Sequence, residues 1–126
     1  MLEIHQRTDF SGYESSVGGI KTDDEIKIIE AFEDGKVIGY CIYTLNSEYA
    51  EVFDIGYGGN LIICDGILRT VMLKAMMTGA DRIVYSTDDT AVEKLKLCDS
   101  GKRELGSIMS VMGCGCKCEK KENISE

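Results

Sequence analysis

Residues 50–86 have the spacing with the clearest chemical use, a strand, a glycine-rich connection, an amphipathic helix and a second strand. Asp65 is well placed as the N-cap of this helix, and Gly79 is placed to end it. Between them an apolar stripe recurs at helical spacing: Ile67, Leu68, Val71, Met72, Ala75 and Met76. The free backbone N–H groups at such a helix start bind phosphate well, so a phosphate-containing ligand is the first chemistry to consider.

The second group with chemical potential is Cys114, Cys116 and Cys118. Thiolates at every second position can converge on zinc or another soft metal where the backbone turns, and Gly113 and Gly115 permit a turn. Structural zinc usually has four ligands. The fourth would come from Cys98, Cys64, His5 or water. The alternative is an exposed, reduced tail with no ligand.

All six cysteines are expected to be reduced thiols, because the N-terminal residues carry no pattern of a secretory signal. Cys41 lies in a strand that is apolar on both faces and is predicted to be a small core residue. Cys64 directly precedes the predicted helix and is either a reactive thiolate or a packing residue.

The whole chain has 126 residues, a net charge of −8 and 44% hydrophobic residues, which suits one globular domain. The negative charge argues against nucleic acid, whose binding needs clustered Lys and Arg. No apolar run reaches the roughly 20 residues that span a bilayer, so we expect no membrane partner and a cytoplasmic location.

The remaining elements must position these groups. The patterns predict strands over residues 2–7, 26–32, 36–45, 49–56, 81–86 and 104–112, and a helix over 89–98 with a Thr90–Glu93 capping box. Asp34-Gly35 is a strong hairpin signal, whereas residues 9–20 are expected to form a loop or a short helical turn. We therefore expect one mixed α/β domain over residues 1–112 and a cysteine-rich tail over 113–126.

Residues 26–98 resemble the GNAT N-acetyltransferase superfamily. The resemblance rests on element order, on Lys36-Val37-Ile38-Gly39-Tyr40 in the second hairpin strand, and on the stretch Gly66–Met72, which is similar to the family's Gly-x-Gly-x-Ala-Leu-Leu. It implies an α/β GNAT-like mixed sheet, an antiparallel meander followed by a β-α-β unit, with helices on the sheet faces. It also implies acyl transfer from acetyl-coenzyme A to a small-molecule or peptide amine.

The same resemblance assigns candidate site residues. The backbone amides of Gly66 to Arg69 would hold the coenzyme pyrophosphate. The full set expected at the coenzyme is Ile55, Tyr57, Asp65, Gly66, Ile67, Leu68, Arg69 and Thr70. The general base would be Glu51 or Asp54, which strand alternation places on opposite faces. The family's helical tyrosine acid has no counterpart in residues 91–97, and Tyr57 or Tyr85 would replace it.

A non-catalytic alternative stays open. Leu68 stands where the family has a second glycine, Asp65 puts a carboxylate at the phosphate position, and the usual tyrosine is missing. These departures favour a GNAT-like binding or regulatory module whose cysteine tail binds metal or senses redox state. An exposed edge strand can also pair two chains, so a homodimer is a further expectation.

Overall fold

The computed structural model describes residues 2–112 and contains one six-stranded mixed sheet. Its elements are β1 (Leu2–Gln6), α1 (Glu14–Gly18), β2 (Ile26–Glu33), β3 (Lys36–Leu45), β4 (Ala50–Gly56), α2 (Leu61–Met77), β5 (Ile83–Tyr85), α3 (Ala91–Lys94), β6 (Glu104–Leu105) and α4 (Met109–Met112). The described strands follow one another across the sheet in chain order, and among them only the β4–β5 pair is parallel. The predicted fold class, a meander followed by a β-α-β unit, is confirmed.

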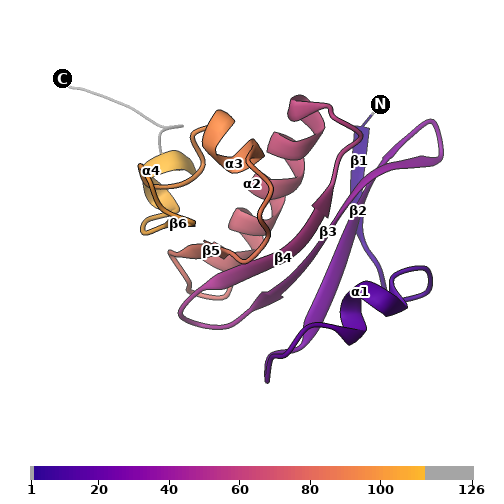
Figure 1. Cartoon of the computed structure of the whole chain (residues 1–126), viewed down its shortest axis with the longest axis horizontal. Coiled ribbons are helices and arrows are strands. Elements are labelled where there is room, and N and C mark those ends of the chain that lie inside the picture. Colours follow the sequence, from indigo (N-terminus) through magenta and orange to yellow (C-terminus); the bar gives the residue numbers. More distant parts are fainter. Residues whose placement is uncertain (1, 113–126) are drawn as a thin grey trace.

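Helices lie on both faces of the sheet (Figure 1). The long helix α2 covers one face, and the five-residue α1 lies on the opposite face (Figure 1). The main core lies under α2, where Cys41 is fully buried as predicted. None of the helices within residues 2–112 has the length and apolar character needed to cross a membrane.

Gly39 sets how closely α2 approaches the sheet. A Cβ atom at Gly39 would lie 2.8 Å from Cδ1 of Ile67 and 2.9 Å from the carbonyl oxygen of Gly56. Real Cβ atoms do not approach other atoms this closely, so only glycine fits under the helix here.

Helix α2 begins at Leu61, and the predicted start at Asp65 is wrong. Asn60 is the N-cap, because its side-chain oxygen accepts hydrogen bonds from the N–H groups of Ile62 at 3.0 Å and Ile63 at 3.4 Å. The helix therefore starts one turn earlier than predicted, and Asp65 lies inside it.

The segment after β5 also differs from the expectation. Helix α3 has four residues, and the side chain of Thr90 forms no cap; the carboxylate of Asp89 accepts from the Ala91 N–H at 2.8 Å instead. Lys96 adopts a positive φ of 59°, which ends the helical turn. The predicted strand 104–112 is two residues long, and α4 follows it, with the Asp81 carboxylate accepting from the Met109 N–H at 2.9 Å.

Candidate functional site

A bulge in β4 brings the two predicted base candidates onto one face of the sheet. The β3–β4 register pairs Thr44 with Glu51 but Ile42 with Asp54, so one extra residue, Phe53, is inserted between Val52 and Asp54. Thr44 and Ile42 lie two residues apart on β3 and share a face, so Glu51 and Asp54 share it too. The prediction that they lie on opposite faces is wrong, because the bulge shifts the alternation.

Each carboxylate accepts a hydrogen bond from a neighbouring hydroxyl. Asp54 accepts from the Tyr40 hydroxyl at 2.9 Å, and Glu51 accepts from the hydroxyl of Ser86. Burial and the hydrogen bond to Asp54 raise the pKa of Tyr40 to about 12, so this phenol stays a donor at neutral pH. Both carboxylates are only half-buried and can reach a ligand on this face.

Strands β4 and β5 separate between Glu51 and Asp54. Their register ends at the pair Val52–Tyr85, and the next hydrogen bond runs from the Ser86 N–H to the Val52 carbonyl at 2.8 Å. In the described part of the chain, β4 beyond Phe53 pairs only with β3. Ligands of open α/β sheets bind outside the carboxyl ends of parallel strands, and this separation lies at such an end.

Tyr57 spans this separation. Its hydroxyl donates to the Asp89 carboxylate at 2.8 Å, linking the end of β4 to the segment that follows β5. The hydrogen bond to Asp89 is the main reason that the pKa of Tyr57 is raised to about 12, and partial burial contributes less. Tyr57, one of the residues expected at the coenzyme, is therefore a neutral phenol at neutral pH.

The start of α2 lies at the end of β4. Gly58 and Gly59 have φ angles of 59° and 77°, and a Cβ atom on either would meet no atom within 4 Å. A hollow of about 310 Å³ adjoins this turn. It is lined by Glu33, Ile38, Tyr57, Gly58, Asn60 and Ile63, among which there is no Lys or Arg. The glycines leave room for a phosphate at this helix start. Two features disfavour phosphate binding: the Glu33 carboxylate is negatively charged, and the Asn60 side chain already accepts from the Ile62 and Ile63 N–H groups.

Most of the predicted coenzyme residues lie inside α2 or the core. Asp65 and Gly66 to Thr70 occupy the second and third helical turns, where backbone amides bond to carbonyls four residues earlier. Ile67, Leu68 and Ile55 are buried in the core. The Arg69 guanidinium bonds to Asp65 at 3.0 Å, and the Thr70 hydroxyl bonds to the Gly66 carbonyl at 2.8 Å. The predicted pyrophosphate role of these amides is therefore wrong, because the helix starts at Leu61.

Tyr85 does not face the separation. Its hydroxyl is buried and donates to the Leu97 carbonyl at 2.7 Å, and burial raises the pKa of Tyr85. A general acid must reach the reacting group, so its predicted acid role has no geometric basis.

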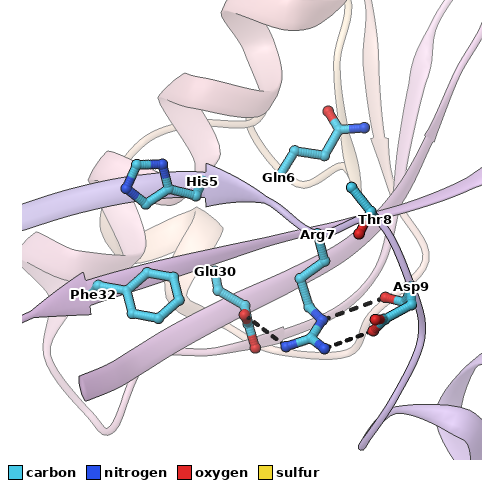
Figure 2. A pocket seen from close by; sticks show the side chains of 7 residues that line it. All are labelled: His5, Gln6, Arg7, Thr8, Asp9, Glu30 and Phe32. Atoms are coloured by element: carbon cyan, nitrogen blue, oxygen red, sulfur yellow. Dashed lines mark hydrogen bonds and ion pairs between the residues drawn. The ribbon is translucent and has the colours of Figure 1, made fainter. Parts of the chain in front are cut away.

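The face that carries Asp54 continues into a polar network under α1. Arg7 bonds to Glu30 at 3.0 Å and to Asp9 at 2.6 Å (Figure 2), and the Tyr13 hydroxyl donates to Glu30 at 2.6 Å. The Tyr13 ring packs 5.1 Å, centroid to centroid, from the Tyr40 ring. The sequence carries no local signal for this network, because its members are far apart in the chain.

Cys64 is buried against the sheet, and burial raises its pKa to about 12. The interpretation of Cys64 as a reactive thiolate is wrong, and its packing role is confirmed. We expect Cys41 and Cys64 to resist iodoacetamide at pH 8 in the folded protein, whereas the half-buried Cys98 reacts faster. Peptide mapping by mass spectrometry measures this, with alkylation in denaturant as the control. Rapid labelling of Cys64 in the folded protein would contradict its burial.

The predicted metal ligands Cys114, Cys116 and Cys118 lie outside the described residues. Within residues 2–112, no three His, Cys, Asp or Glu side chains are grouped so that they could hold a metal ion. The metal site of the tail stays a prediction.

With this geometry, the structure has the fold of the GNAT acetyltransferases, and the resemblance stated from the sequence is confirmed at the level of the fold. The sequence matches no protein-family model and no curated protein. The likeness to solved structures is therefore one of fold.

Three solved structures illustrate it. A GNAT family acetyltransferase from Elizabethkingia anophelis with acetyl-CoA bound is 17% identical, with a TM-score of 0.55 over 76% of this chain and 71% of that one. An aminoglycoside acetyltransferase from an uncultured soil metagenomic sample is 15% identical, with a TM-score of 0.55 over 78% and 88%. A ribosomal-protein-alanine N-acetyltransferase from Brucella melitensis biovar Abortus is 15% identical, with a TM-score of 0.54 over 81% and 91%.

Proposed function

We propose that this protein transfers an acyl group from acyl-coenzyme A to an amine. The observation that carries the proposal is the bulge at Phe53, which places Glu51 and Asp54 on one face beside the separation of β4 and β5. A GNAT structure with acetyl-CoA bound among the similar folds supports acyl-coenzyme A as the co-substrate.

The coenzyme arm would lie along the unpaired edge of β4. An open strand edge presents N–H and C=O groups to an extended ligand, and the amides of the pantetheine arm can pair with them. The phosphates would then reach the turn at Gly58 and Gly59, where the backbone is uncovered. This position replaces the one predicted at Gly66 to Arg69.

The chemistry requires a neutral amine and a positioned thioester. The amine nitrogen attacks the thioester carbonyl carbon, Asp54 accepts the proton that the nitrogen releases, and the C–S bond breaks. The coenzyme leaves as a thiolate and takes a proton from water, since the Tyr85 hydroxyl is buried against the Leu97 carbonyl and the Tyr57 hydroxyl donates to Asp89. Glu51, on the same face, attracts the ammonium form of the acceptor.

Isothermal titration with acetyl-coenzyme A and with free coenzyme A tests the proposal. We expect a dissociation constant in the micromolar range, followed by release of free thiol when a panel of small-molecule and peptide amines is added. A coenzyme sample without amine serves as the control for thiol release. Absence of binding at millimolar coenzyme would overturn the proposal and favour the non-catalytic alternative.

Glu33 offers a sharper test of where the coenzyme binds. Its carboxylate lines the hollow at the start of α2 and repels phosphate, so Glu33→Lys is expected to tighten coenzyme A binding by about three- to tenfold at low salt. The gain should shrink as ionic strength rises. Titration calorimetry at two salt concentrations measures it.

Glu48→Lys is the matched control, because Glu48 is also exposed but lies in the β3–β4 connection at the other end of β4. An equal gain in both variants would show a general charge effect and would contradict the placement at Gly58 and Gly59.

A further inference from the structure

Within residues 2–112, no strand pairs with the outer edge of β1. In the described sheet the two outer strands are β1 and β6. Strand β6 has two residues and is flanked by the Arg82–Glu104 ion pair, whereas β1 has five residues paired in regular register with β2. A regular edge of this length is a template for another strand.

The hydrogen bonds of β1 fix which groups point outward. The Arg7 N–H donates to the Ile28 carbonyl at 2.8 Å, and bonded pairs alternate along an antiparallel ladder. Glu3 and His5 therefore also direct their backbone groups toward β2. Leu2, Ile4 and Gln6 direct their N–H and C=O groups toward the open edge.

We propose that two copies of this chain pair antiparallel through β1 and form one continuous sheet. The register with complete overlap places Ile4 opposite the partner's Ile4 and Leu2 opposite the partner's Gln6. In this register every outward N–H meets an outward carbonyl, because even-numbered residues oppose even-numbered ones. A closed two-fold pair of this kind leaves no β1 edge free for a third chain.

The side chains are complementary in the same register. Glu3 lies opposite the partner's His5, and His5 lies opposite the partner's Glu3. Such a non-hydrogen-bonded pair brings its side chains closest together. Within one chain the Glu3 carboxylate already bonds the His5 ring at 2.8 Å, with both side chains more than half exposed, 57% and 62%. Pairing gives each of these groups a second complementary neighbour. This self-complementarity favours a second copy over another occupant of the edge.

The interface is short, so association should be weak. Five residues on each side bury less than a standard protein interface, which corresponds to a dissociation constant in the micromolar range or above. Sedimentation of the full chain from micromolar to millimolar concentration is expected to show a reversible monomer–dimer equilibrium. A monomer over the whole range would overturn the proposal.

Gln6→Pro tests the edge itself. Proline removes the outward N–H of Gln6 but no bond to β2, and proline is tolerated where the N–H of an edge strand faces solvent. We expect Gln6→Pro to weaken dimerisation at least tenfold with an unchanged circular dichroism spectrum. Gln6→Ala, which keeps the N–H, should dimerise as the wild type does. Equal dimerisation of Gln6→Pro and Gln6→Ala would contradict pairing through β1.

Charge exchange tests the register. His5→Glu places like charges opposite each other and should weaken the dimer, and the double variant Glu3→Lys with His5→Glu should restore it. In mixed isotope-labelled samples, the Cα protons of Glu3 and the partner's His5 should show a nuclear Overhauser effect between chains. Its absence in a sample that is dimeric by sedimentation would overturn this register.

Discussion

Asp54→Asn is expected to lower kcat for acyl transfer by about 10²- to 10⁴-fold, the usual loss on removing a general base. The amide has the same size and can still accept the hydrogen bond that the Tyr40 hydroxyl donates, but it cannot take up the proton of the attacking amine. Binding of coenzyme A should stay within roughly twofold of the wild type, because the change removes an interaction needed only in the reaction. Steady-state kinetics with the best amine of the panel measure kcat, and calorimetry measures binding.

Glu51→Gln is the matched control on the same face of β4. If Glu51 only attracts the cationic acceptor, its loss should raise the KM for the amine and leave kcat near the wild-type value. A loss of kcat in Glu51→Gln with an unaffected Asp54→Asn would assign the base to Glu51. Unchanged kcat in both variants would contradict general-base catalysis from β4.

Leu68→Ala is expected to lower the free energy of unfolding by about 2–5 kcal/mol, the range observed when a buried leucine is truncated. Leu68 is fully buried between α2 and the sheet, although the resemblance to the family placed it at the coenzyme pyrophosphate. Because the helix starts at Leu61, shortening this side chain should not tighten coenzyme binding. Urea unfolding followed by circular dichroism measures the loss.

Met77→Ala on the same helix is the control, because Met77 is 78% exposed. Its free energy of unfolding should stay within about 0.5 kcal/mol of the wild type. A Leu68→Ala variant as stable as Met77→Ala would contradict the burial of Leu68 in the core. Tighter binding of coenzyme A by Leu68→Ala would indicate that Leu68 lies at the coenzyme.

The sheet could be predicted from the sequence because its signals are local. Asp34 and Gly35 have φ angles of 54° and 78°, the conformation that such a two-residue hairpin turn requires, and they set the pairing of Glu33 with Lys36. A bulge at Ile38 shifts the register of the rest of the β2–β3 pair. Strand β3 was predicted with its observed bounds, because its apolar residues cover both faces. The parallel β4–β5 pair followed from the strand–helix–strand order.

The details of the site could not be predicted in the same way. Leu61 to Cys64 form an unbroken apolar run that carries no helical periodicity. The periodic apolar stripe begins only at Ile67, so the helix was predicted to start at Asp65 and not at Leu61. The signal that could have corrected it is Asn60 after two glycines, a favoured cap residue behind a flexible turn. The bulge at Phe53 has no signal in the sequence, because it depends on how β4 pairs with β3.

The tyrosine pair under α1 connects the N-terminal segment to Asp54 on β4. Tyr13 directly precedes α1, a five-residue helix with no buried residue, and its ring rests against Tyr40, whose hydroxyl holds Asp54. A helix this short has little stability of its own, so it depends on this contact and on the bond from Tyr13 to Glu30. Anything that displaces the first quarter of the chain therefore loosens the orientation of a carboxylate some forty residues later. In the proposed reaction, the N-terminal segment would thus orient the base without contributing an atom itself.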